Sequence, residues 1–161
     1  MKTLIFLFIN LCFLQSFSQD KNLLKEFGIE KDSINELTFK SSDEFKSFVK
    51  IFQEKKGFRP QWLIFDSTGK LLKHKLDIHI KECGKGDVAE IKKKYQKKLP
   101  NISEVDTFFN EELIKPNGEN YIIIFMWMKG LGLYNEHTFD TYNVWKENDN
   151  LDFYFLNLNT E

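Results

Sequence analysis

The chain has 161 residues, of which 42% are hydrophobic and 16% aromatic, a size and composition that suit one domain with a single core. Its 23 basic and 24 acidic residues give a net charge of −1, which singles out no class of partner and speaks against a nucleic-acid-binding surface. After the apolar start of the chain, no stretch is long and apolar enough to predict a membrane span.

The N-terminus has the features of a secretory signal peptide. Met1-Lys2 is followed by the apolar run Leu4–Leu14 and then by small residues. This run is too short to cross a hydrocarbon core of about 30 Å, which favours a cleaved signal over a permanent anchor. A lipoprotein signal at Cys12 and a buried helix are the alternatives. We predict cleavage after Ser18, so that residues 19–161 form a single exported domain in the periplasm or outside the cell.

Cleavage would leave Cys83 as the only thiol of the mature chain. One cysteine cannot form an internal disulfide, so stability has to come from the core. Residues 1–18 contain one basic residue and no acidic one, which leaves 22 basic against 24 acidic residues and a net charge of −2.

The first part of the mature chain predicts a helix, a strand and a second helix. Asp20 can cap a short helix that Gly28 ends, and Glu36–Lys40 is a brief strand candidate. Ser41, with Glu44 three residues later, predicts the N-terminal cap of the next helix. That helix carries an apolar stripe that indicates packing on a sheet: Phe45, Phe48, Val49 and Phe52.

A hairpin and two helices are predicted next. Gln61–Asp66 and Lys70–Leu76 read as strands around a turn at Ser67-Thr68-Gly69. Asp87 begins a helix that ends before Pro100. Ser103 is predicted to cap a further helix whose apolar residues are Val105, Phe108, Phe109 and Leu113, and Lys115-Pro116-Asn117-Gly118 predicts a turn.

The last forty residues read as a βαβ unit around which the chain is organised. Tyr121–Trp127 is an unbroken apolar run that suits a central strand covered on both faces. A glycine turn follows, and Asn135 is predicted to cap a helix with Phe139, Tyr142 and Trp145 at three-residue spacing. Asn148-Asp149-Asn150 breaks that helix before a second strand, Leu151–Leu158, which the crossover would make parallel to the first.

This unit resembles the first half of a thioredoxin. The resemblance is carried by Phe125-Met126-Trp127, the turn, the helix and the final Leu-Asn-Leu-Asn. In the family the turn holds W-C-G-P-C; here Gly132 falls on the motif glycine, while Leu131 and Tyr134 fall on the two cysteine positions. The redox pair is therefore absent.

The other half of the resemblance lies upstream. Gly57–Leu72 is similar to the family's proline and hairpin segment, and Asp87–Leu99 is similar to its closing helix. The reversed order is what a circular permutation gives. The resemblance implies a permuted thioredoxin-like α/β fold with a mixed sheet of four to five strands and flanking helices, and a cis peptide bond before Pro60, facing the Leu131 turn.

The lost redox turn is the candidate binding site. An apolar surface there would mark a contact for a protein or peptide; the alternative is that the side chains close over one another and seal the core. The candidate residues are Arg59, Pro60, Trp62, Trp127, Leu131, Gly132, Leu133 and Tyr134. The turn precedes a helix N-terminus but matches no phosphate-binding motif.

Other constellations support enzyme readings only weakly. Asp77, His79, Glu82 and Cys83 are metal-binding residue types, but their spacing matches no familiar zinc site. Flanking lysines can make Cys83 reactive. His137 has no identifiable catalytic partner, and the lysines of residues 92–98 read as a solvated helix face.

The sequence thus favours an exported, non-catalytic binding module without cofactor or metal, whose partner is a protein or peptide. The alternatives are a one-cysteine thiol enzyme or a metal-dependent enzyme using Cys83 or His79, and a small periplasmic inhibitor or immunity-type protein.

Overall fold

The computed structural model describes residues 23–54, 62–72, 99–113 and 115–159. The chain divides into two compact units, residues 1–34 and 35–161. In the first, residues 23–26 are helical, and Gly28 follows with a φ of +70°. Its amide donates to the Lys25 carbonyl, so Gly28 ends the helix as predicted. A short 3-10 helix, η1 (Lys31–Ser33), comes next.

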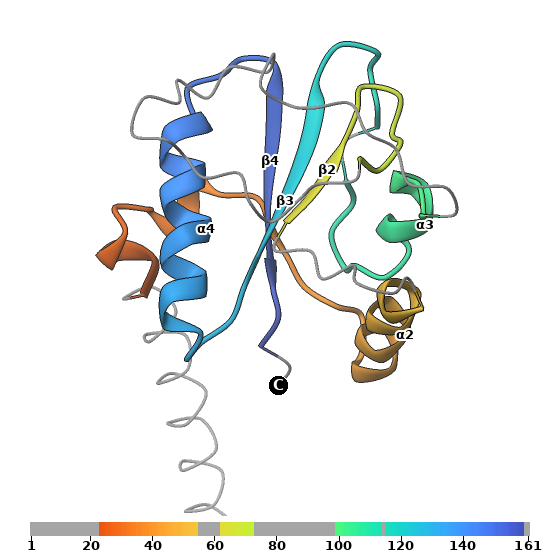
Figure 1. Ribbon diagram of the computed structural model, residues 1–161, viewed down its shortest axis with the longest axis horizontal. Helices are drawn as coiled ribbons and strands as arrows, with labels where there is room; N and C mark the ends of the chain where they lie inside the picture. Colours follow the sequence, from red (N-terminus) through yellow and green to blue (C-terminus); the bar gives the residue numbers. More distant parts are fainter. Residues whose placement is uncertain (1–22, 55–61, 73–98, 114, 160–161) are drawn as a thin grey trace, which may run out of the picture. The chain divides into compact units, whose positions relative to one another are not determined.

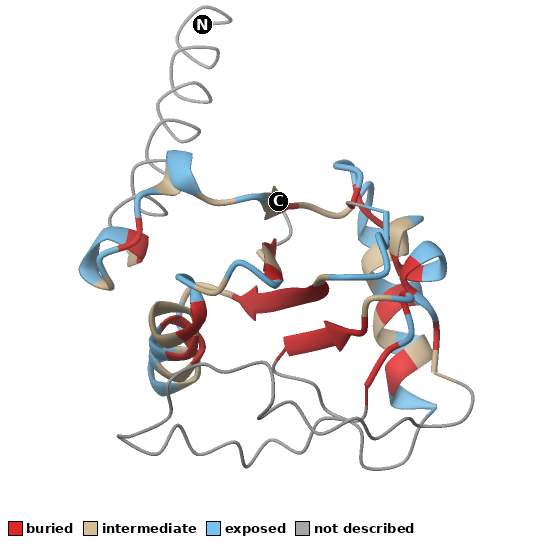
Figure 2. Ribbon diagram, turned by 90° about the horizontal axis from the view of Figure 1, so that it is seen from above, coloured by how far each residue is buried: buried red, intermediate tan, exposed pale blue. Residues whose placement is uncertain are grey.

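The second unit is built on a four-stranded mixed sheet with the order β1-β4-β3-β2 (Figure 1). β3 (Tyr121–Trp127) lies parallel to β4 (Leu151–Asn157) and antiparallel to β2 (Trp62–Phe65). β1 (Glu36–Leu37) lies parallel to β4 at the edge of the sheet. All seven residues of β3 are buried, and Figure 2 shows buried strands in red at the centre of the fold. The predictions that 121–127 is the central strand and that 151–158 is parallel to it are confirmed.

The predicted hairpin also forms. The Leu72 amide donates to the Ile64 carbonyl at 2.8 Å, and Leu71 pairs with Phe65. Gly69 in the turn has a φ of +81°, and a Cβ there would lie 2.7 Å from Ile102 Cγ2, so the turn requires glycine. Residues 73–76 of the predicted strand, and the predicted helix after Asp87, lie outside the described residues.

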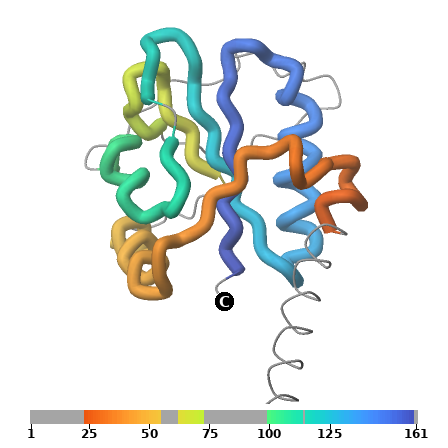
Figure 3. Tube along the Cα trace, turned by 180° about the vertical axis from the view of Figure 1, so that it is seen from behind, coloured from red at the N-terminus to blue at the C-terminus, as the bar shows by residue number. Residues whose placement is uncertain are grey.

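Helices cover both faces of the sheet. α2 (Ser42–Gln53) and α3 (Ile102–Asp106) lie on one face, and α4 (Gly132–Trp145) lies on the other; the front and back views agree (Figures 1 and 3). The architecture is therefore mixed α/β, as predicted, with an open sheet between two helical layers.

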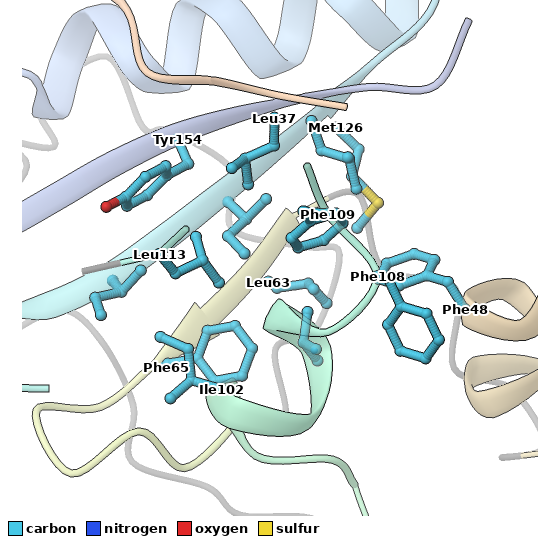
Figure 4. Close-up of a cluster of buried hydrophobic side chains, with 14 of the residues drawn as sticks. Leu37, Phe48, Leu63, Phe65, Ile102, Phe108, Phe109, Leu113, Met126 and Tyr154 are labelled. Atoms are coloured by element: carbon cyan, nitrogen blue, oxygen red, sulfur yellow. The ribbon is translucent and has the colours of Figure 1, made fainter. Parts of the chain in front are cut away.

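The α2/α3 face holds the main hydrophobic core (Figure 4). The predicted stripe of α2 contributes Phe48 and Phe52, and the rings of Phe48 and Phe52 lie 4.8 Å apart. The other buried members are Leu37, Leu63, Phe65, Leu71, Ile102, Val105, Phe108, Phe109, Leu113, Ile122, Ile124, Met126, Tyr154 and Leu156. Alternate residues of β3 thus point into this core.

One predicted helix start is confirmed and one is wrong. The Ser41 hydroxyl accepts a hydrogen bond from the Glu44 amide at 3.2 Å and caps α2. Ser103 does not cap α3, which instead begins after Asn101: the Asn101 side chain accepts from the Glu104 amide, and the Glu104 carboxylate accepts from the Asn101 amide. This reciprocal box is the stronger cap, and α3 ends at Asp106, before Phe108.

The first strand is shorter than predicted. β1 stops at Leu37 because the Thr38 amide donates to the Glu111 carboxylate at 2.8 Å and the Lys40 amide donates to the Phe108 carbonyl. These bonds carry the chain away from β4 and occupy main-chain groups at the edge, which reduces the unpaired backbone that an edge strand presents.

Candidate binding surface at the β3–α4 turn

The turn between β3 and α4 is a tight, hydrogen-bonded loop. Gly130 has a φ of +80°, a conformation that side-chain-bearing residues rarely adopt. The Leu131 amide donates to the Met128 carbonyl at 3.3 Å. The amides of Tyr134 and Asn135 then donate to the Leu131 carbonyl at 2.8 and 3.1 Å. Leu131 is therefore the N-cap residue, and the helix starts at Gly132.

Asn135 was predicted to cap this helix, and that prediction is wrong. The N-cap is Leu131, four residues earlier, and no side-chain hydrogen bond caps the helix there. Asn135 is 2% exposed. Its side-chain oxygen accepts from the Met128 amide at 3.2 Å, while its side-chain nitrogen donates to the Met128 carbonyl at 2.7 Å. The side-chain amide of Asn135 therefore bonds the main chain of the turn and does not cap the helix.

The predicted site residues differ in exposure. Leu133 is 83% exposed, the one exposed large hydrophobic residue in the part of the chain that the structure describes. Gly132 is exposed, and Leu131 and Tyr134 are half-buried. These four neighbours lie on the N-cap and first turn of α4, so the exposed apolar side chain of Leu133 lies directly beside the turn.

The two tryptophans of the predicted site lie in the core. Trp127 is fully buried, with its ring centroid 6.4 Å from that of Phe139. Trp62 is 3% exposed and lies 6.1 Å from Phe125 and 5.5 Å from His137. The sequence left open whether the turn is sealed or open; the tryptophans are sealed beneath α4, whereas Leu133 faces solvent. Arg59 and Pro60, with the predicted cis bond, lie outside the described residues.

A polar atom is left unpaired beneath the turn. The indole nitrogen of Trp127 is buried and has no hydrogen-bond partner among the described residues. Burying such a donor without a partner costs about 1–3 kcal/mol. At Trp127, the last residue of β3, burial of the ring therefore stabilises the fold while burial of the indole nitrogen destabilises it.

Asparagines at and just after the end of β4 also stabilise the turn by hydrogen bonds, a feature that was not predicted from the sequence. The Asn159 side-chain oxygen accepts from the Lys129 amide at 3.0 Å, and the Leu158 amide donates to the Trp127 carbonyl at 2.9 Å. Asn159 bonds Asn157 through its amide and its side chain. The available signal was the Leu-Asn-Leu-Asn alternation at residues 156–159, which places two asparagines on one face of the chain.

Burial changes the acid–base behaviour of Tyr134. Desolvation raises the pKa of its phenol from 10.0 to about 12, because burial disfavours the charged form. Tyr134 therefore stays neutral at physiological pH, and its hydroxyl is not a base there. The neutral Tyr134 side chain offers a binding partner its ring as contact area and its hydroxyl as a hydrogen-bonding group.

The described residues contain no metal-binding group of three or more His, Cys, Asp or Glu side chains. In the same residues, no helix has the length and hydropathy needed to cross a bilayer. His137 lies on α4 against Trp62. Cys83, His79, Asp77 and Glu82 lie outside the described ranges.

Comparison of the chain with protein-family models, with curated proteins and with solved structures gives no significant match.

Proposed function

We propose that this protein is an exported, non-catalytic thioredoxin-like module that binds another protein or a peptide through the β3–α4 turn. The observation that carries the proposal is Leu133, a large apolar side chain 83% exposed at the start of a helix whose preceding turn is held by hydrogen bonds to Trp127, Met128 and Lys129. Exposed apolar surface on an ordered frame is typical of a contact site.

The sheet supports the thioredoxin-like part of the proposal. The order β4-β3-β2, with the first pair parallel and the second antiparallel, is the order that the resemblance implies for its two halves. The hairpin strand that pairs with β2 continues the same order. A circular permutation accounts for the position of β2 upstream of β3 in the sequence.

The turn supports the non-catalytic part. Leu131 is the N-cap of α4 and Tyr134 lies in its first turn, the two positions that hold the redox cysteines in the family that the chain resembles. Neither side chain can form the mixed disulfide through which thiol exchange proceeds. Both offer contact area, and Tyr134 adds a phenol hydroxyl.

The test is site-specific photo-crosslinking in the cell that makes the protein. A benzophenone amino acid replaces Leu133 in one variant and Asp140, an exposed residue further along α4, in the control. We expect a discrete crosslinked protein from position 133 and none from position 140, and Leu133→Asp should remove the partner in co-purification. Equal or absent crosslinking at both positions would count against a binding site at this turn.

Export has its own test. The apolar start of the chain and its small residues motivate cleavage after Ser18, so mass spectrometry of the protein from the cell envelope should find a chain that begins at Gln19. An intact chain from Met1 in that fraction would contradict the signal-peptide prediction.

A further inference from the structure

The main chain of the β3–α4 turn is held by side chains from two other segments. Its consecutive polar groups all have partners: the Trp127 carbonyl, both Met128 groups and the Lys129 amide. These partners come from α4 and from the residues after β4. The shape of the turn therefore depends on these other segments as well as on its own Leu131–Met128 hydrogen bond.

Asn135 is the central partner. A single side-chain amide accepts from the Met128 amide and donates to the Met128 carbonyl, the pattern that two peptide groups form in a sheet. Both ends of the amide are needed, because the acceptor serves one group and the donor serves the other. With 2% of its surface exposed, Asn135 has little water to replace either bond.

Asn159 adds a second attachment. Its side-chain oxygen accepts from the Lys129 amide at 3.0 Å. Its own amide donates to Asn157, whose side-chain nitrogen donates to the Glu36 carboxylate on β1 at 3.1 Å. The turn is thus connected to β1 through asparagine side chains.

We propose that Asn135 and Asn159 are positioning residues that fix the geometry of the turn and so the placement of Leu131 and Leu133. The proposal rests on the binding function inferred above. The hydrogen bonds of the two side-chain amides hold the contact surface rigid before binding, which lowers the conformational entropy that is lost on binding. Neither asparagine has to touch the partner.

A disulfide probe measures this geometry without a partner. In the full chain with Cys12 and Cys83 replaced by serine, Leu131→Cys and Tyr134→Cys place two thiols three residues apart at the start of α4. Disulfide closure requires Cα atoms about 4.4–6.8 Å apart. Oxidised glutathione supplies the oxidation: two protein thiols and one glutathione disulfide become one protein disulfide and two glutathione thiols. The equilibrium constant reports how well the turn holds the two sulfurs together.

We expect Asn135→Ala to lower this equilibrium constant at least about tenfold, which corresponds to about 1.4 kcal/mol. Asn135→Asp should do the same, because it keeps the shape and one acceptor but loses the donor to Met128. Asn159→Ala should produce a smaller decrease. The control is Asn110→Ala, which removes hydrogen bonds to Thr38 and Phe39 instead and should change the constant less than twofold.

The outcomes separate the two proposals. Folded Asn135 variants with an unchanged equilibrium constant would overturn the positioning role while leaving the crosslinking result at Leu133 intact. No crosslinking from position 133 in the protein that keeps Asn135, together with a shifted equilibrium constant in the Asn135 variants, would refute the binding function alone. If the Asn135 variants do not fold, Asn159→Ala decides the question. A dithiol protein that stays reduced in glutathione disulfide would show that the turn lacks this geometry and would overturn the proposal.

Discussion

The two faces of the sheet bury different chemistry. The hydrophobic cluster on the α2/α3 face consists of apolar side chains and Tyr154, while the buried carboxylate of Asp66 lies at the hairpin turn, where it accepts from the amides of Thr68 and Lys70. The α4 face buries Asn135, Thr138 and Thr141, together with the indole nitrogen of Trp127, which has no hydrogen-bond partner within the described ranges. Buried polar groups without hydrogen-bond partners, and other departures from good packing, occur most often at functional sites. The contrast therefore points to the α4 face, where the turn with Leu133 also lies.

The α4 face is nevertheless well packed, and ring–ring contacts contribute to that packing. Phe125 lies 5.5 Å from Phe155 and 6.0 Å from Tyr142, and Tyr142 lies edge-on to Phe153 at 5.5 Å. The edge-to-face pairs of Tyr142 with Phe125 and Phe153 each add about 0.5–1.5 kcal/mol beyond the area that they bury. The ring cluster holds α4 on the sheet although the helix is poor in strong helix formers.

The largest expected effect is on the α2/α3 face. Phe65 on β2 is fully buried, and Phe65→Ala should lower the free energy of unfolding by about 3–5 kcal/mol, since the cavity cannot collapse in a closed core. Urea denaturation measures the change, with an unchanged slope as the check that the unfolded state is the same. A loss below about 1 kcal/mol would mean that this face is loosely packed and would remove the contrast.

The next largest effect comes from a comparison of two buried polar side chains on the α4 face, Asn135 and Thr141. Asn135→Ala removes the partner of the Met128 amide and one of the two donors to the Met128 carbonyl, which keeps its bond from the Leu131 amide. The change should cost about 2–3 kcal/mol. Thr141→Val is the matched control: its hydroxyl donates to the His137 carbonyl four residues earlier, so its loss should cost less than about 1 kcal/mol. Equal losses in urea denaturation would show that Asn135 contributes only ordinary packing.

The sequence predicted the part of the molecule that follows from periodicity. All seven residues of the apolar run of β3 are buried, as predicted. Of the predicted α2 stripe, Phe48 and Phe52 are buried, while Phe45 and Val49 are half-buried. The helix starts at Ser103 and Asn135 were wrong because several residues near each end can cap. The choice between them depends on tertiary contacts such as the Asn135–Met128 pair, which a local pattern does not contain.

The candidate site was predictable only in outline. The glycine turn and its neighbours were found from the sequence, but the division into buried Trp127 and exposed Leu133 depends on where α4 lies on the sheet. The role of Asn159 was not predictable from composition, because it requires the end of β4 to pass beside the β3–α4 turn. Side-chain to main-chain bonds between distant segments leave only weak traces in a sequence.

A smaller effect appears at alkaline pH. The folded pKa of Tyr134 is about 12 and the unfolded value is about 10. The contribution of Tyr134 is fully present below pH 10 and is lost as the pH rises from about 10 to 12, because the unfolded chain ionises first. Tyr134→Phe should therefore flatten the decrease in stability over this range, by up to about 2 kcal/mol at pH 12. Urea denaturation at pH 9, 10.5 and 11.5 measures the difference, and parallel curves for the two proteins would contradict the burial of the phenol.

The smallest effect tests the unpaired indole directly. Trp127→Phe removes contact area beneath α4, which costs stability, but it also removes a buried donor that has no partner, which restores about 1–3 kcal/mol. The two terms oppose each other, so the free energy of unfolding should change by less than about 1 kcal/mol. Trp62→Phe is the matched control in the same layer. Among the described residues, the buried side-chain nitrogen that lacks a partner is that of Trp127, so replacing Trp62 loses contact area and removes no unpaired donor. We expect Trp62→Phe to be the more destabilising of the two in urea denaturation. The reverse order would show that packing alone governs this face, and the difference between the two faces would then carry no information about the site.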